Sequence, residues 1–255
     1  MRSMLSVAIR LGFLLAALLP GARPAHAQDV MDHVRADRWA EAQAAVAGHP
    51  DPVARKLVAW MRLMAPGQGR VDEIGAFLAT NPDWPMQVSL ARRRDEALAL
   101  EPDNALARAE CKRAAPTLTG ALLRCADALA ASGETAAPML KAAWATAAGD
   151  AAWEARFIAR WSGVLSREDH LKRFEQLGWT DPAAARRQAD RLDKPWQAYT
   201  FLAYICFELK KFSEALEAIN AALQYPEAGK DSERLKKAIE DAIKEREALA
   251  NSPAA

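Results

Sequence analysis

Three cysteines are the residues best suited to covalent chemistry in this chain of 255 residues: Cys111, Cys125 and Cys206. Cys111 and Cys125 flank a segment that turns at Pro116, so they could meet across two adjacent helices and form a disulfide, provided that their Cα atoms lie within about 7 Å. Cys206 stands in an apolar pattern typical of a small buried residue. No CxxC motif or Cys/His cluster has the spacing of metal ligands, so we expect neither a metal nor a cofactor.

The acids and histidines could supply acid–base chemistry, but their positions do not favour it. Glycan cleavage needs a carboxylic acid that stays protonated in a shaped cleft. The acids stand mostly at helix starts or on polar faces, and Asp51, Asp169 and Asp181 are typical capping positions. Histidines such as His170 are scattered and have no partner four residues away, and no glycine-rich loop could cradle a phosphate. We therefore expect no catalytic residue.

Aromatic and arginine side chains offer binding chemistry instead. The chain has eight tryptophans, which is many for a helical protein of this size. Several recur beside apolar residues at helical spacing, where they could form a sugar-stacking surface or fill a helical core; these are Trp60, Trp144, Trp153 and Trp161. The core interpretation is favoured. The run of residues 92–94, three arginines, could contact anionic groups or form a solvated face.

The elements that position these residues are best defined at Tyr199–Leu223, YTFLAYICFELKKFSEALEAINAAL. This stretch predicts two short helices joined by a turn at residues 210–212, with small or apolar residues where antiparallel helices touch; they are Tyr199, Leu202, Ala203, Cys206, Ala215, Ile219 and Ala222. The pattern resembles a tetratricopeptide repeat, with Ala203 in place of the usual glycine and Cys206 in place of the tyrosine. Such a hairpin cannot bury its faces alone, so it implies helical neighbours.

The rest of the chain predicts helices with short connections and almost no strand. Gly, Pro and Asp residues punctuate residues 29–255 at regular intervals, as at Asp181-Pro182, and residues 166–169 are typical of a capping box. A one-sided helix over residues 231–250 suits the end of a stack. We expect an all-α solenoid of helical hairpins with this helix as a cap, and a compact helical bundle is the alternative. Arginine gives way to lysine near Asp193, which places a junction between modules at residues 194–196.

Residues of about 37–193 resemble the N-terminal superhelical domain of the soluble lytic murein transglycosylases. The likeness rests on several stretches, which are FLATNPDWP at 77–85 with the arginine-rich helix at 90–98, AAW at 142–144, FIARW at 157–161, LSREDHL at 165–171, LGW at 177–179 and AAARR at 183–187. In that family this region is a stack of helical hairpins in the periplasm. It supports a separate lysozyme-like domain that cleaves the glycan strands of peptidoglycan.

The chain departs from that family where the chemistry would be. The family's catalytic glutamate is followed by serine, with Gly-Leu-Met-Gln downstream, and neither sequence occurs here. A tetratricopeptide-like hairpin and a capping helix stand in place of the catalytic domain, so no catalytic residue can be transferred. We therefore expect three segments: a leader at 1–27, a superhelix at 28–193 that carries this resemblance, and a hairpin with its cap at 194–255.

The first 27 residues predict an export signal. Two arginines precede an apolar run too short to be a stable membrane anchor, and Ala25-His26-Ala27 is a small-x-small cleavage site. An uncleaved anchor is the alternative. Cleavage after Ala27 changes the formal charge from +1 to −2, because three arginines and no acid are lost. A near-neutral chain has no electrostatic reason to bind nucleic acid, and we expect a periplasmic protein with no stable membrane span.

These observations predict an exported, non-catalytic protein of the cell envelope that binds or scaffolds a protein, a peptide or peptidoglycan. The alternative is the non-catalytic portion of a soluble lytic murein transglycosylase. In tetratricopeptide stacks the first helix of each hairpin lines a concave groove. Gln197, Thr200 and Tyr204 could face that groove, or Tyr204 could instead pack against the helix before Asp193.

Overall fold

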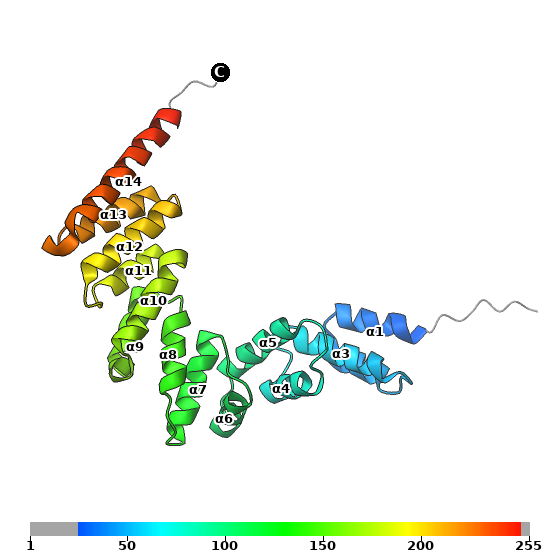
Figure 1. The fold of residues 1–255 in the computed structure, drawn as a ribbon. Helices are drawn as coiled ribbons and strands as arrows, with labels where there is room; N and C mark the ends of the chain where they lie inside the picture. Colours follow the sequence, from blue (N-terminus) through cyan, green and yellow to red (C-terminus); the bar gives the residue numbers. More distant parts are fainter. Residues whose placement is uncertain (1–24, 251–255) are drawn as a thin grey trace, which may run out of the picture. The chain divides into compact units, whose positions relative to one another are not determined.

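A computed structural model describes residues 25–250 of the chain, and helices are the only regular structure in that range (Figure 1). It has fourteen α-helices and two short 3-10 helices. The α-helices are α1 (Ala25–Arg35), α2 (Trp39–Val46), α3 (Pro52–Met64), α4 (Val71–Thr80), α5 (Gln87–Ala99), α6 (Asn104–Arg113), α7 (Thr119–Ala131), α8 (Ala137–Thr146), α9 (Ala151–Trp161), α10 (Arg167–Thr180), α11 (Pro182–Ala189), α12 (Pro195–Glu208), α13 (Phe212–Ala222) and α14 (Gly229–Ala250). The 3-10 helices are η1 (Ser162–Val164) and η2 (Pro226–Ala228).

Several helices start at a residue whose side chain accepts a backbone hydrogen bond. The Ser166 hydroxyl accepts a hydrogen bond from Asp169 N, and the Asp169 carboxylate accepts one from Ser166 N, which completes the predicted capping box of α10. Asp181 caps α11 by accepting from Ala184 N at 3.1 Å. Helix α7 has no such residue of its own. Asp95 of α5 accepts from Thr117 N and Leu118 N in its place, which ties the start of α7 to α5.

Several helices end in a left-handed residue that closes a Schellman motif. After α7 the residue is Gly133, with φ of 71°, and Glu134 N donates to Leu129 O at 3.0 Å. After α12 the same position holds Lys210, with φ of 59°, and Lys211 N donates to Cys206 O at 2.8 Å. The turn between α12 and α13 is therefore where the sequence predicts it, except that Phe212 already belongs to α13.

The chain divides into two compact units, which meet in sequence between Arg62 and Leu63. In the described part of unit 1 (residues 25–62), α1, α2 and α3 enclose a small core of Val30, Ala42, Val46 and Val58. The predicted leader, residues 1–27, lies outside the described residues apart from 25–27, which begin α1. No helix in residues 25–250 is both long and apolar enough to cross a membrane.

Unit 2 (described residues 63–250) is a stack of helical hairpins. Helix α10 packs on α11, α12 on α13, and α13 on α14, while α8, α10, α12 and α14 also touch in succession (Figure 1). The main contacts join helices no more than two places apart in the sequence, as in a solenoid. The predicted all-α solenoid is therefore confirmed.

The core of unit 2 has three clusters along the stack. One surrounds Cys111 and Cys125 between α4 and α7, a second surrounds Trp144 between α7 and α9, and the third joins α10 to α14. The seven residues predicted to lie between the two repeat helices are all buried in the third cluster. This cluster runs without a break past Lys194, and the predicted module limits at 193 and 194 stay a prediction.

Candidate functional site

The three residues predicted to face a groove line one concavity on the surface of α12. Gln197, Thr200 and Tyr204 border a volume of about 620 Å³ together with η2 and the first turns of α14. They share a face because they are three and four residues apart on one helix. The structure thus brings the three residues together on an open face of the repeat hairpin.

Thr200 has a mainly structural part in this concavity. Its hydroxyl lies 2.9 Å from the backbone oxygen of Trp196 and 2.9 Å from the hydroxyl of Ser232 on α14. Ser232 in turn donates to Ala228 O at 2.8 Å. These bonds fasten α14 to α12, so the Thr200 hydroxyl is already occupied by the protein.

Aromatic side chains supply the open surface. Tyr204 is 48% exposed and Phe201, one residue after Thr200, is 44% exposed. Phe201 was not among the predicted groove residues, although its position three residues before Tyr204 puts it on the same face. Its ring lies 6.4 Å from that of Phe174 on α10, so the apolar surface continues toward α10.

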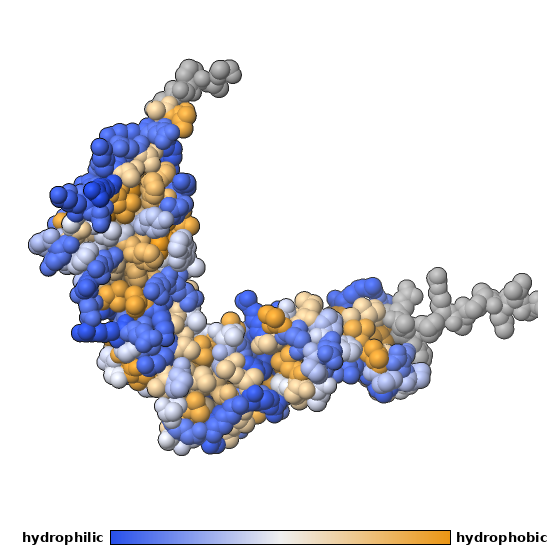
Figure 2. Space-filling model, viewed as in Figure 1, coloured by the Kyte–Doolittle hydropathy of each residue, from blue (hydrophilic) through white to orange (hydrophobic). Residues whose placement is uncertain are grey.

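A second concavity of about 470 Å³ adjoins the first between α10 and α12. Gln197 and Phe201 line both, and α10 contributes Leu171, which is also exposed. We call the two concavities together the α12 groove. On the face seen in Figure 2, hydrophobic residues form patches over α10 to α13 with hydrophilic residues between and around them.

The charges around the α12 groove are mixed in sign. Arg167 pairs with Asp193 at 2.7 Å, but both side chains are mostly exposed, so the pair adds little stability. Lys194 and Lys230 line the groove and have no ion pair within residues 25–250. A groove of this kind suits a polypeptide with apolar side chains better than a polyanion.

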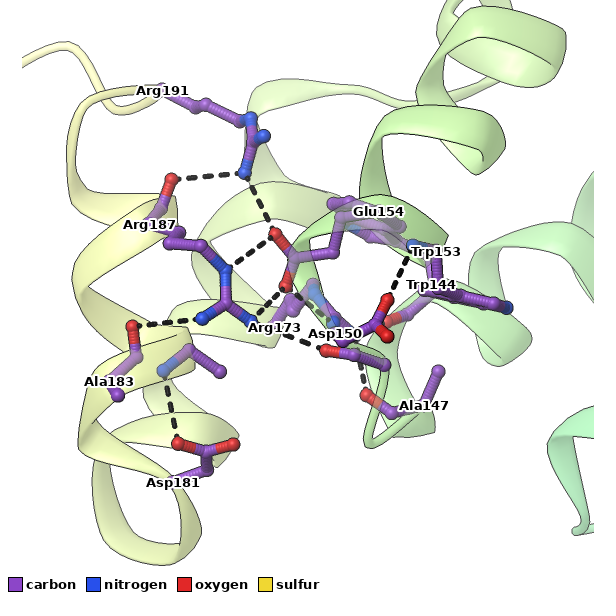
Figure 3. A network of polar contacts seen from close by, with 12 residues as sticks. Trp144, Ala147, Asp150, Trp153, Glu154, Arg173, Asp181, Ala183, Arg187 and Arg191 are labelled. Carbon is purple, nitrogen blue, oxygen red and sulfur yellow. Dashed lines mark hydrogen bonds and ion pairs between the residues drawn. The ribbon is translucent and has the colours of Figure 1, made fainter.

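The most buried polar network of unit 2 lies apart from the groove, where α9, α10 and α11 meet (Figure 3). Glu154 of α9 accepts hydrogen bonds from Arg173 at 3.0 Å and from Arg187 at 3.2 Å, and Arg191 lies 3.6 Å away. Burial would raise the pKa of Glu154, but the hydrogen bonds from Arg187 and Arg173 outweigh it and the pKa is lowered. Glu154 is therefore ionised and cannot serve as the protonated acid that glycan cleavage requires.

Arg173 anchors this network to the neighbouring aromatic core. Its guanidinium donates to the backbone oxygens of Trp144 and Ala147, and it lies 4.5 Å from the centroid of the Trp144 ring. His170 meets the same ring edge-on, and burial lowers its pKa, so it carries little charge at neutral pH. Arg173 is fully buried and His170 is partly buried, and both pack against this aromatic core.

Glu110 differs from Glu154 because its pKa is raised and not lowered. Burial raises the pKa of this carboxyl, which is 1% exposed between α4 and α6 beside Gly75. Within residues 25–250 its only ion pair is with Arg113, at 3.2 Å, and its Oε2 has no hydrogen-bond partner there. A raised pKa is typical of catalytic acids, but such deep burial leaves no room for a substrate.

The three acids predicted as helix caps have structural roles. Asp51, Asp169 and Asp181 each accept backbone hydrogen bonds at a helix start, as predicted. Residues 25–250 contain no group of three or more His, Cys, Asp or Glu side chains that could hold a metal ion.

The candidate disulfide joins two helices of unit 2. Cys111 of α6 and Cys125 of α7 are bonded, with their Cα atoms 5.8 Å apart, and Cys206 is free and buried. The bond lies inside the core cluster between α4 and α7. Its place indicates a structural bond and not an exposed redox centre.

The comparisons with known proteins give no further guide to the site. A scan against protein-family models and searches of curated proteins and of solved structures found no match.

Proposed function

We propose that this chain is an exported, non-catalytic helical-repeat protein of the cell envelope that binds a peptide segment of a protein partner in the α12 groove. The observation that carries the proposal is the row of Leu171, Phe201 and Tyr204, three large apolar side chains left open in a concave surface. Half-exposed aromatic residues in a concave face are typical anchors of peptide recognition.

Export is supported by the disulfide between Cys111 and Cys125, because such bonds form and persist in oxidising compartments. A non-catalytic role is supported by the acids of residues 25–250. Those at helix starts are caps, Glu154 is held ionised by arginines, and Glu110 is closed off from solvent. We therefore expect the purified protein to release no anhydro-muropeptides from peptidoglycan sacculi.

A photo-cross-linking experiment tests the groove directly. A photoreactive amino acid at Gln197, which lines both concavities, should capture one protein partner in the native cell envelope. The matched position Lys237 lies exposed on α14 and lines neither concavity, so it should capture none.

The Tyr204→Ala variant then decides whether the capture depends on the groove. It should reduce the cross-linked product and weaken the isolated interaction by about 1 kcal/mol or more, while helix content stays unchanged. A product that forms equally at Lys237, or that Tyr204→Ala leaves unchanged, would overturn the proposal. If the partner is peptidoglycan, the protein should instead sediment with sacculi, and Tyr204→Ala should reduce the amount that sediments.

The alternative function, the non-catalytic portion of a lytic transglycosylase, rests on the resemblance of residues 37–193. It makes a different prediction for the same experiment. The partner captured from Gln197 would then be a polypeptide with a lysozyme-like domain. Adding the purified chain to that polypeptide would change the rate at which the polypeptide cleaves sacculi.

A further inference from the structure

A third concavity of unit 2 has the features of a small-molecule site, and it lies between α7 and α9, away from the α12 groove. Its volume is about 350 Å³, within the range of ligand pockets, which is roughly 300–1,000 Å³. Apolar side chains that include Trp153, Phe157 and Trp161 line it together with three charged ones, which are Asp127, Arg156 and Arg160.

The two tryptophans give the concavity fixed ring surfaces. Trp153 stacks on the fully buried Trp144, with the ring centroids 6.0 Å apart and the planes 14° from parallel. Its ring also lies against the backbone of Gly149, where any side chain would collide with it. Trp153 and Trp161 are nevertheless only partly buried, so part of each ring remains available to a ligand.

The charges of the rim leave one cation without a partner. Arg160 donates to Asp127 at 3.0 Å and covers the Trp161 ring at 4.5 Å, so these two charges compensate each other. Arg156, one helical turn before Arg160, is exposed and has no hydrogen bond or ion pair within residues 25–250. The concavity therefore has a net positive charge, located on a guanidinium that can bind a carboxylate through two parallel hydrogen bonds.

We propose that this concavity binds a small molecule in which a six-membered ring carries a carboxylate. The ring packs on the Trp153 and Trp161 surfaces, and the carboxylate pairs with Arg156. Two sources share this chemistry, an acidic sugar and an aromatic acid.

Titration of the 15N-labelled chain tests the site through the indole N–H signals of Trp153 and Trp161, assigned with the Phe variants of each. Glucuronate represents the acidic sugars and benzoate the aromatic acids, while glucose and acetate each lack one of the two required groups. At least one of the first two should shift these signals in a saturable way, and which of them does so identifies the source. Glucose and acetate should bind at least about tenfold more weakly, since each loses one of the two contacts.

The variant Arg156→Gln should weaken binding about tenfold or more, as expected when a hydrogen-bonded ion pair is lost. Because Arg156 is exposed and makes no hydrogen bond or ion pair within residues 25–250, this variant should keep the native spectrum. The control Arg38→Gln, an exposed arginine of unit 1, should bind as the parent does. The proposal is overturned if neither acid gives saturable shifts, if acetate or glucose binds equally well, or if Arg156→Gln binds unchanged.

Discussion

At the scale of single residues, the buried carboxyl of Glu110 makes stability depend on pH. Burial raises its pKa in the folded chain above the value in the unfolded chain. The folded state is therefore favoured at low pH, where Glu110 is protonated, and loses this stabilisation as the pH rises through the folded pKa.

The variant Glu110→Gln removes that dependence, because its side chain stays neutral. At pH 7 we expect the free energy of unfolding of Glu110→Gln to exceed that of the parent by about 1 kcal/mol. The variant should therefore unfold at a higher temperature. The difference should shrink as the pH falls to about 4, near the ordinary pKa of glutamate. Thermal unfolding at several pH values measures this. A variant that is less stable than the parent at pH 7 would show that the pair with Arg113 outweighs the cost of burial.

Glu154 should behave in the opposite way, because its charge is compensated by arginines. Glu154→Gln leaves the fully buried Arg173 without a carboxylate, and loss of one partner of a buried pair costs about 3 kcal/mol or more. Denaturant unfolding measures the loss. Arg191→Gln is the control, since Arg191 is partly exposed and 3.6 Å away, and it should cost less than about 1 kcal/mol. Equal effects of the two variants would contradict the assignment.

Local sequence patterns predicted the side chains that contact backbone groups a few residues away. They did not predict the side chains that pair with residues far away in the sequence. The capping roles of Asp169 and Asp181 were readable because each acid contacts a backbone group three residues away or closer. Glu154 and Arg173 are 19 residues apart and stand among other charged residues, so nothing in the sequence marks them as a buried pair. Arg156 was missed because an exposed arginine carries no local signal.

At the scale of elements, the end of α12 carries a residue poorly suited to its backbone. Lys210 adopts the left-handed conformation that Gly133 adopts after α7. A side chain in this conformation costs roughly 1 kcal/mol relative to glycine. Lys210→Gly should therefore stabilise the chain by about 1 kcal/mol in denaturant unfolding.

The reverse change at the other Schellman motif is the matched control. Gly133→Ala places a side chain at a positive φ where no atom beyond its two chain neighbours lies within 4 Å, so its effect reports the backbone conformation alone. It should destabilise by a similar amount. If Lys210→Gly destabilises the chain instead, the contact between Lys210 and the Phe207 ring is worth more than the backbone term.

Because Cys111 and Cys125 are bonded to each other, we expect one reactive thiol per chain. Under denaturing, non-reducing conditions only Cys206 should react, and three reactive thiols per chain would contradict the bond. A cross-link between residues 14 positions apart should stabilise by roughly 3 kcal/mol in the chain-entropy model. The double variant Cys111→Ala with Cys125→Ala should lose about that amount in denaturant unfolding.

The Gly, Pro and Asp residues of the sequence predicted where helices begin and end. They did not predict which side chains pair or become buried along a helix. In the last helix Ala238 belongs to the apolar pattern but is exposed, and Glu240 pairs with Lys236 at 3.8 Å and not with Lys244. The reason is that α13 and α12 cover only a narrow stripe of α14 around Ile239. Periodicity identifies an apolar side of a helix but not the width that its neighbours will cover.

At the scale of the whole molecule, the proposal of export predicts the mature start of the chain. Processing after Ala27 should leave Gln28 as the first residue and a formal charge of −2. Intact mass after expression with the native leader measures this. A periplasmic species that retains Met1 would contradict it, and a variant with Ala25 and Ala27 replaced by Lys should remain unprocessed.

The succession of neighbour-to-neighbour contacts in unit 2 has a consequence for amide hydrogen exchange. A helix that touches only its neighbours can open without disturbing distant ones, so exchange rates should form a gradient along the stack. Helix α14 should exchange early, because its last turn is exposed and its main contacts are with α12, α13 and η2. A peptide bound in the α12 groove would bridge α12 and α14, so it should slow exchange in α14 while leaving α4 to α7 unchanged.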